Sequence, residues 1–515
     1  MRVLLQRFYI LLRSRRLFWA ILAVFICESA WIALSAVYPQ AFDENFHFGL
    51  IKVYSHHWLP FLSGQPSNAN AYGAVAYDPS YLYHYVMSFP YRIIALFAHS
   101  QMIQVIYLRF INIALAAAGL VLFYRVLLRA RVSRAFANLA MALFILIPIV
   151  PQLAGQVNYD NMLFPLVAWA FLLAMKAADE LRARKPSVRT LGTFVILSIF
   201  AVMVKYEFLP IAAGVVLFLL YTAHRSFRSH WRQFGRSLRS SWTTQSRLAK
   251  VVLVVLFVIG LGLFIRRDGR NLIEYHTFTP NCSKILSVQD CKAYGPWAAS
   301  YRWHKEVVAE RAAGPIDYEN PVTYTMSWMY WLWYRLFFAV SGPVHDFRNY
   351  PPLPVPAAAG AFIWITGIAG VIVVAVRRRL FDAYPYIPLF GTVIAVYLIA
   401  LWTEGYLQYH KTDVMVLMNG RYLLPILFPI SVIVGRAFSV ILRRRPALRS
   451  LAALVLLFCF IAGGGTINFI MRSDHTWDWP NPTVTSVNDT ARKVLRPIIV
   501  HNDKYRPEHH IWFFN

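Results

Sequence analysis

The chain has 515 residues, of which 58% are hydrophobic and only 15% are charged. Soluble globular proteins are usually about 45–50% apolar and about 25% charged, so this composition argues against a soluble protein. The excess apolar residues occur in blocks of about 16–24 residues, which is long enough to cross a hydrocarbon core of roughly 30 Å. The sequence therefore predicts an all-α, polytopic integral membrane protein.

The net charge is +27, because 51 Lys and Arg residues stand against 24 Asp and Glu residues. Such a charge often indicates nucleic-acid binding. Here the basic clusters lie between the apolar blocks, as they do in the cytoplasmic loops of membrane proteins. We therefore expect membrane lipids and no nucleic acid as partners of these clusters. They occupy residues 13–16, 125–134, 182–189, 225–250, 377–379 and 443–445.

The apolar blocks predict about eleven spanning helices. Arginines before the first block hold the N-terminus inside, so residues 39–102 form the first outer loop. This loop contains an apolar run, 82–97, which is broken by Pro90 and is typical of juxtamembrane helices. The second outer loop is 266–356. The predicted spans cover residues 17–38, 103–128, 136–153, 162–178, 191–204, 209–223, 251–264, 357–376, 384–402, 422–442 and 451–470.

Residues 324–340, which are rich in Trp and Tyr, decide the predicted topology. If this segment crosses the membrane, the later basic clusters change sides, whereas an interfacial position keeps them all inside. Trp and Tyr favour the interface. We therefore expect residues 1–470 to form one transmembrane module and residues 471–515 to form an external C-terminal tail. Cys282 and Cys291 share the second outer loop, where an oxidising compartment would allow a disulfide.

An acidic pair, Asp43–Glu44, begins a few residues after the first predicted span, and His47 follows it. Carboxylates at a membrane boundary are costly unless they are solvated, paired or functional. If the segment is helical, Asp43 and His47 lie on one face, four residues apart. The alternative is a solvated loop, or an N-cap at Asp43.

Two further motifs lie at predicted helix ends. Asp160 stands at the outer start of the fourth predicted span, where an N-cap would also explain an acid. Lys205–Tyr206–Glu207 separates two half-length apolar runs, and such a break lets polar backbone line a cavity. Lys205 could bind a phosphate as a point charge. Alternatively, it pairs with Glu207 or extends to the interface.

A fourth motif, residues 419–425, contains Arg421 and Tyr422 at the outer end of a late span. An arginine there could form a fork onto a phosphate or diphosphate, although an interface anchor explains it equally well. His56, His57 and His84 share the first outer loop. They are possible metal ligands, but exposed interfacial histidines are commoner.

These four motifs, in this order and on one face, resemble the C-type glycosyltransferase superfamily. The acidic pair occupies that superfamily's usual place after the first helix, and Asp160 matches its second-loop acid by position. Lys205 resembles the Lys-containing bend of aminoarabinose and mannosyl transferases. Residues 420–425 and the Asp-Glu-x-x-His pattern resemble an uncharacterised bacterial branch. Two departures are the single Pro79, where relatives often have two prolines, and the lack of a large soluble C-terminal domain.

The resemblance implies a membrane glycosyltransferase. It would move a sugar from a polyprenyl-phosphate or polyprenyl-diphosphate donor to a glycan, lipid or protein acceptor. The reaction would take place at the outer face of a bacterial cytoplasmic membrane. In this reading Asp43 deprotonates the acceptor hydroxyl, and the attack inverts the anomeric carbon.

The resemblance also assigns roles to the remaining candidates. Glu44 and Asp160 join Asp43 as catalytic candidates, and Lys205 and Arg421 would stabilise the phosphate leaving group. Members of the superfamily differ in their need for metal, so a divalent ion on Asp43 and Asp160 stays open. The substrate-binding candidates are His47, Lys205, Glu207, Arg421 and Tyr422.

The main alternative is a transporter or flippase for a lipid-linked sugar, because discontinuous helices recur in transporters. Against it, the sequence shows no paired half-repeat, and the candidate acids gather at one face. A polysaccharide polymerase or ligase and a non-catalytic membrane scaffold are further alternatives.

Overall fold

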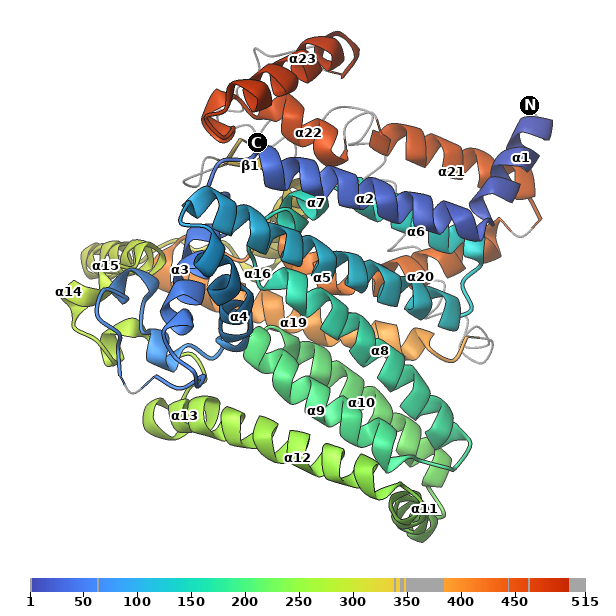
Figure 1. Ribbon diagram of the computed structural model, residues 1–515. Helices are drawn as coiled ribbons and strands as arrows, with labels where there is room; N and C mark the ends of the chain where they lie inside the picture. Colours follow the sequence, from blue (N-terminus) through green and yellow to red (C-terminus); the bar gives the residue numbers. More distant parts are fainter. Residues whose placement is uncertain are drawn as a thin grey trace.

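The computed structural model describes residues 2–62, 64–337, 340–342, 347–348, 384–442, 444–461 and 464–499. Within these ranges the chain is almost entirely helical. The exception is one antiparallel pair of two-residue strands, β1 (Val340–Ser341) and β2 (Phe347–Arg348). Figure 1 shows long helices that pack side by side as a bundle, with shorter helices gathered at one end. The predicted all-α fold class is confirmed.

Seven stretches of helix among the described residues are long and apolar enough to cross a membrane. They indicate a membrane protein. The helix α12 (Arg247–Phe264) continues through η3 (Ile265–Gly269) into α13 (Arg270–Tyr275), and η6 (Gly420–Leu423) leads into α20 (Leu424–Ile441). The other five are α2 (Arg15–Ser35), α5 (Gln101–Arg129), α8 (Asp160–Arg182), α10 (Phe208–Phe227) and α19 (Ile387–Thr412).

The predicted count of about eleven spans is not confirmed. One predicted span, 357–376, lies outside the described residues. Three others coincide with apolar helices that are shorter than the seven candidates. These are α6 (Arg134–Ile145), α9 (Val188–Val204) and α21 (Pro446–Ile461).

Two predicted spans were drawn too long, because proline and glycine interrupt them. The first, 136–153, ends as α6 before Pro148, and a separate short helix, α7 (Ile149–Ala154), follows. Proline removes a backbone donor and clashes with the preceding turn of a helix. The second, 451–470, is divided into α21 and α22 (Gly465–Arg472) around the glycines at 464 and 465, which favour a change of backbone direction.

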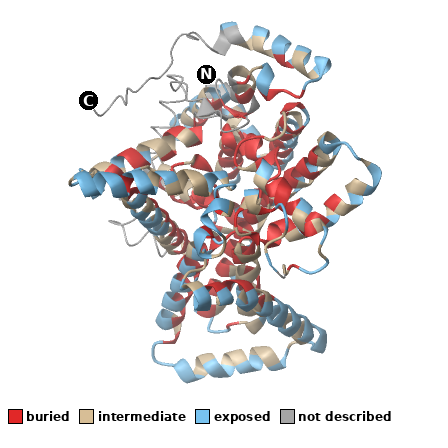
Figure 2. Ribbon diagram, turned by 90° about the vertical axis from the view of Figure 1, so that its left-hand side faces the viewer, coloured by how far each residue is buried: buried red, intermediate tan, exposed pale blue. Residues whose placement is uncertain are grey.

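The apolar residues divide into a packed core and a lipid-compatible surface. Figure 2 shows the buried residues running through the middle of the bundle. There, Phe144 of α6 and Phe428 of α20 pack with ring centroids 4.6 Å apart. In contrast, α12 exposes all five of its valines, and none of its leucines is buried. Such an exposed apolar helix is stable where lipid replaces water around it.

The first predicted outer loop folds into short helices at one end of the bundle, on the left in Figure 1. They are α3 (Glu44–Ser55), η1 (Asn70–Tyr72), η2 (Val75–Tyr77) and α4 (Leu82–Phe97). The predicted helical run 82–97 is confirmed as α4, which continues through Pro90 and packs against α3. We call this end of the molecule the α3 end.

The described part of the second predicted outer loop also lies at the α3 end. Cys282 and Cys291 are bonded to each other. Asp290, beside this disulfide, accepts a hydrogen bond of 2.9 Å from the side chain of Asn70, so the two loops are joined. After α13, its described helical elements are η4 (Cys282–Lys284), α14 (Val288–Cys291), α15 (Gly295–Ala313) and α16 (Pro321–Phe337).

The Trp- and Tyr-rich segment forms most of α16, which packs against η6 and α19. Its predicted position in the membrane interface stays a prediction. The opposite end of the bundle carries the basic side chains of α5, α8 and α20. There Arg129 pairs with Asp179 at 2.8 Å, and Arg182 donates to the carbonyl of Pro385 at 2.6 Å. This end also carries α1 (Arg2–Leu12) and α11 (Trp231–Thr243), which Figure 1 shows on the right.

The described part of the predicted C-terminal tail is helical. After α22, the chain forms η7 (His475–Trp477) and α23 (Pro482–Ile499). These elements contact α2 at the top of Figure 1. Residues 473–499 are therefore part of the folded molecule, and the rest of the predicted tail lies outside the described residues.

Candidate functional site

The turn before α3 presents Asp43 in an unusual backbone conformation. Phe42 and Asp43 have φ angles of 60° and 68°, in the left-handed region. Asp tolerates this region better than most residues, but for the bulky Phe it is a strained conformation. Asp43 stands at the N-cap position of α3, yet its side chain makes no capping hydrogen bond. The capping alternative for Asp43 is therefore not realised, and its carboxylate turns to another partner.

That partner is Arg421 of η6, which lies 378 residues later in the sequence. Its guanidinium lies 3.2 Å from Asp43 Oδ2 and donates to the carbonyl of Phe42 at 3.3 Å. Arg421 is buried, whereas about 33% of the Asp43 side chain is exposed. Asp43 is thus a carboxylate that is held by a buried cation and still accessible from outside the bundle.

Glu44, the next residue, has the opposite surroundings. Its side chain is fully buried, and Arg109 of α5 binds both of its oxygens at 2.7 and 2.8 Å. The backbone N–H groups of Gln40 and Val157 donate to the same carboxylate at 2.8 and 3.0 Å. Four donors occupy Glu44, so its contacts are those of a structural anchor. Its catalytic assignment stays a prediction.

Sequence reasoning did not single out Arg109. A signal was present, because an arginine inside the apolar block 103–128 is costly and usually has a partner or a function. Arg109 also donates to the carbonyls of Ala33, Ala36 and Val37. It therefore ties the end of α2 to the turn that carries Asp43.

A second charged group forms around Lys205, between α9 and α10. The ammonium nitrogen of Lys205 lies 2.6 Å from Asp160 Oδ1 and also pairs with Glu207. Lys205 and Asp160 are both buried. The predicted helix break is confirmed, since α9 ends at Val204 and α10 begins at Phe208. The predicted pairing of Lys205 with Glu207 is present, and Asp160 joins it.

Tyr422 brings the two charged groups together. Its ring centroid lies 5.4 Å from Lys205 Nζ and 5.4 Å from the guanidinium carbon of Arg421. Tyr397 of α19 donates to the carbonyl oxygen of Tyr422 at 2.7 Å and also bonds to Glu207. Five of the predicted site residues therefore form a single cluster with Asp43.

Two polar atoms of this cluster lack partners. Asp160 Oδ2 and Arg421 Nε are buried and have no hydrogen-bond partner among the described residues. Both side chains line a cavity of about 30 Å³, whose other walls are mainly apolar. A water molecule needs at least about 10–15 Å³ of such volume. The cavity is therefore large enough for water but too small for a sugar.

His47 also lies in this region, where it meets a histidine of α4. Its Nδ1 is 2.9 Å from Nε2 of His84, and its ring packs edge-on against Tyr159. Burial lowers the pKa of His84 to about 3, and burial together with nearby cations lowers the pKa of His47 well below its usual value. Both histidines are thus neutral at pH 7.

An aromatic group stands beside Asp43 at the α3 end. Phe46, three residues after Asp43, has its ring centroid 6.3 Å from Tyr72 and 5.9 Å from Tyr294. Tyr294 follows the disulfide-bonded segment, and burial, together with the nearby carboxylate of Asp43, raises its pKa. Sequence reasoning did not identify Tyr294. The only available signal was the aromatic content of a loop that also contains two cysteines.

Fold and site together define a class: an all-helical membrane protein with a buried cluster of charged residues at one end of the bundle. Comparison with protein-family models, with curated proteins and with solved structures found no match to this chain.

Proposed function

We propose that this protein is a membrane glycosyltransferase that uses a polyprenyl-phosphate or polyprenyl-diphosphate sugar as donor. The main support is the cluster in which the ring of Tyr422 lies near both the Asp43–Arg421 pair and the Lys205 group. One accessible carboxylate and two buried cations within one cluster match the needs of sugar transfer from a phosphate leaving group. The base accepts the proton of the acceptor, and cations stabilise the charge that develops on the phosphate.

In the proposed reaction, Asp43 accepts the proton of the acceptor hydroxyl. The hydroxyl oxygen forms a bond to the anomeric carbon of the sugar, and the bond from that carbon to the phosphate oxygen breaks. The electron pair of the broken bond leaves with the polyprenyl phosphate or diphosphate. Attack opposite to the leaving group inverts the configuration of the anomeric carbon.

Arg421 links donor binding to the activation of the base. Its guanidinium holds Asp43 at 3.2 Å. A donor phosphate is a strong, bidentate partner for a guanidinium. Phosphate binding at Arg421, including its unpartnered Nε, would therefore release Asp43 to accept a proton. Lys205 would supply the second positive charge at the leaving group.

The remaining candidates have supporting roles in this proposal. Asp160 and Glu207 hold Lys205, and Asp160 Oδ2 is free to accept a hydrogen bond from a water molecule in the small cavity. Tyr422 lies near both cations, and neutral His47 packs against Tyr159. Phe46, Tyr72 and Tyr294 offer faces on which a sugar ring can pack, since apolar faces of sugars favour aromatic rings.

A divalent metal ion does not fit this arrangement. Among the described residues, no group of three or more His, Cys, Asp or Glu side chains is placed to hold one. Asp43 and Asp160, the two candidate ligands, each pair with a cationic side chain. A metal ion would require both cations to move away. No step of the proposed mechanism therefore uses a metal.

We propose that the α3 end faces the outside of a bacterial cytoplasmic membrane. The gathering of basic side chains at the opposite end supports this orientation, because Lys and Arg favour the cytoplasmic side. The proposal retains about eleven spans, in which α6, α9, α21 and residues 357–376 join the seven long candidates.

A transfer assay on purified protein in detergent tests the proposed function. The donors are radiolabelled polyprenyl-phosphate and polyprenyl-diphosphate sugars prepared from bacterial membranes, with a membrane extract as the source of acceptors. We expect label to move to an acceptor, or to water, with the unmodified protein and not with Asp43→Asn. Asp317→Asn is the matched control, because Asp317 is an exposed acid in another loop.

The assay also separates this proposal from its main alternative. Full transfer by Asp43→Asn would show that Asp43 is not the base. No transfer with any donor, together with movement of labelled lipid across liposome membranes, would favour a flippase. The break between α9 and α10 is the feature that favours this alternative, because broken helices recur in transporters.

A further inference from the structure

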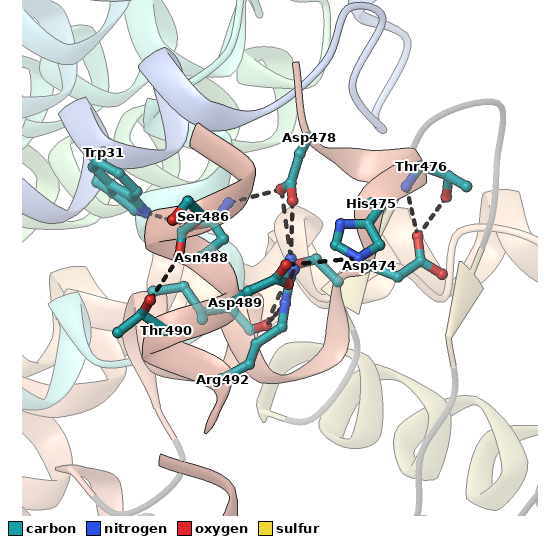
Figure 3. Close-up of polar contacts among 12 residues, drawn as sticks. Trp31, Asp474, His475, Thr476, Asp478, Ser486, Asn488, Asp489, Thr490 and Arg492 are labelled. Carbon is teal, nitrogen blue, oxygen red and sulfur yellow. Dashed lines mark hydrogen bonds and ion pairs between the residues drawn. The ribbon is translucent and has the colours of Figure 1, made fainter. Parts of the chain in front are cut away.

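The segment after α22 folds back onto the outer end of α2. We call residues 473–492 the C-terminal strap. Figure 3 shows its polar contacts, which are centred on Asp478. Asp478 is buried and accepts a hydrogen bond of 2.7 Å from Asn488, and its other oxygen lies 3.3 Å from Arg492. These contacts join the residue that follows η7 to α23, so that η7 and the first part of α23 form one unit.

The strap is anchored to α2 by side chain and backbone. Asn488 accepts a hydrogen bond of 3.1 Å from the indole nitrogen of Trp31 (Figure 3). Val37 donates to the carbonyl of Trp477, and Trp479 donates to the carbonyl of Ser35, both at 2.8 Å. These two bonds form an antiparallel bridge between Ala36 and Asp478. Trp477 is fully buried, in a small core with Ile32, Ala36 and Phe469.

From this bridge the strap reaches the residues that hold the candidate catalytic turn. The ring of Trp479 lies 5.7 Å from the guanidinium carbon of Arg109. Arg109 binds Glu44 and the carbonyls of Ala33, Ala36 and Val37. The strap thus covers Arg109 and fixes the backbone that Arg109 binds. Glu44 directly follows Asp43. A displacement of Arg109 would therefore move Glu44 and, with it, the candidate base Asp43.

We propose that the C-terminal strap is a positioning element for the turn that carries Asp43. Trp479 holds Arg109 against the end of α2, and Arg109 in turn holds Glu44. The catalytic part of this inference rests on the proposed glycosyltransferase function. The mechanical part does not, because it concerns only the rigidity of residues 37–47. A misplaced catalytic group lowers the rate of the chemical step more than substrate binding.

The experiment compares Trp479→Ala and Trp479→Phe in the full-length protein. For Trp479→Ala we expect backbone amides in residues 37–47 to exchange hydrogen at least roughly tenfold faster, as measured by mass spectrometry. We also expect kcat to fall by roughly tenfold or more, with KM changed less than about twofold. Trp479→Phe keeps a ring over Arg109, so both values should return close to those of the unmodified protein. Trp169→Ala, at an exposed position on α8, is the matched control.

The hydrogen-exchange measurement and the enzyme assay test separate parts of this inference. Unchanged exchange in residues 37–47 of Trp479→Ala overturns the positioning role, whatever the enzyme assay shows. Faster exchange in Trp479→Ala would support the mechanical part. If the unmodified protein then showed no transfer, the proposed function would be contradicted. If Trp479→Ala does not fold, Asn488→Ala replaces it. That variant cuts the contacts to Trp31 and Asp478 and leaves Trp479 in place, and the same exchange result is expected.

Discussion

At the scale of single residues, the adjacent carboxylates Asp43 and Glu44 differ in every contact. Asp43 is about 33% exposed and has one cationic partner, whereas Glu44 is fully buried and receives four hydrogen bonds. A buried ion pair that loses one partner leaves an uncompensated charge, which is strongly destabilising. The Asp43–Arg421 pair differs from this case, because Arg421 is buried but Asp43 is partly solvated. Substitutions of the two carboxylates should therefore separate folding from function.

We expect Glu44→Gln to lower the free energy of unfolding by about 3–5 kcal/mol, because Arg109 then stays buried without its counter-charge. Asp43→Asn should lower it less than Glu44→Gln does, because the Asp43 side chain is partly solvated and an amide oxygen can still face Arg421, while it should abolish transfer. Thermal unfolding in detergent and the transfer assay measure the two effects. Equal stability losses in both variants would contradict the different roles given to the two carboxylates.

The buried histidines make a prediction about pH. Burial holds the pKa of His84 at about 3, whereas its ordinary value is 6.5. Between these values the unfolded chain binds a proton that the folded protein does not. Unfolding therefore takes up a proton, and stability falls as the pH falls from 6.5 towards 3. One such group gives a slope of about 1.4 kcal/mol per pH unit in this window.

This slope can be measured as the unfolding temperature between pH 7.5 and pH 4.5. His84→Gln keeps a polar side chain of similar size without a titrating ring, so the dependence on pH should become shallower in this window. His56→Gln, at an exposed position after α3, is the control and should leave the slope unchanged. An unaltered slope in His84→Gln would contradict a buried, neutral histidine at this position.

The residues of the candidate site were only partly predictable. Asp43, Asp160, Lys205 and Arg421 stand out because charges are costly beside apolar blocks. The sequence does not reveal how these residues pair, because Arg421 and Asp43 are 378 residues apart and meet only in the folded bundle. Tyr294 escaped notice because nothing in an aromatic, polar loop marks one tyrosine above the others.

At the scale of helical elements, the position of Arg421 depends on how closely η6 approaches α16. A Cβ added at Gly420 would lie 2.4 Å from the Cα of Leu336 and 2.5 Å from its backbone nitrogen. Backbone atoms cannot move aside as a flexible side chain can. Gly420 therefore sets the distance between the two elements, and the next residue, Arg421, is placed by that contact.

We expect Gly420→Ala to destabilise the protein by about 1–3 kcal/mol, the usual cost of overpacking. It should also lower transfer, because the guanidinium of Arg421 shifts away from Asp43. The matched control is Gly391→Ala in α19, where no atom lies within 4 Å of an added Cβ. That change should be neutral or slightly stabilising, since alanine favours helix more than glycine does. A neutral Gly420→Ala would show that α16 and η6 are not held this close.

The helical elements were more predictable than their ends. Long apolar blocks correctly indicated α2, α5, α8 and α19, because length alone marks a helix that can cross a membrane. The break at Lys205 was also visible, since a charged tripeptide interrupts two apolar runs. The shorter α6 was not, although Pro148 carried the signal. Apolar residues on both sides of a proline make an interrupted block look continuous.

At the scale of the whole molecule, the charges are distributed unequally along the bundle. The candidate site occupies the α3 end, while Arg129, Arg182 and Arg436 gather at the opposite end. Arg436 there donates to a carbonyl of the turn that follows α5. Basic loops are retained on the cytoplasmic side of a membrane. The proposed orientation follows from this asymmetry and can be tested without knowing any substrate.

Labelling of single cysteines tests the orientation. Cys27 and Cys459 are the free cysteines among the described residues and are first replaced by alanine, while the disulfide stays. We expect a membrane-impermeant maleimide to label His56→Cys, after α3, in intact bacterial cells. Ser229→Cys, in the exposed turn between α10 and α11, should be labelled only after the cells are permeabilised. The reverse pattern would place the candidate site inside the cell, where a donor in the outer leaflet cannot reach it. The positions of the two charged ends would then have to be explained by something other than the retention of basic loops.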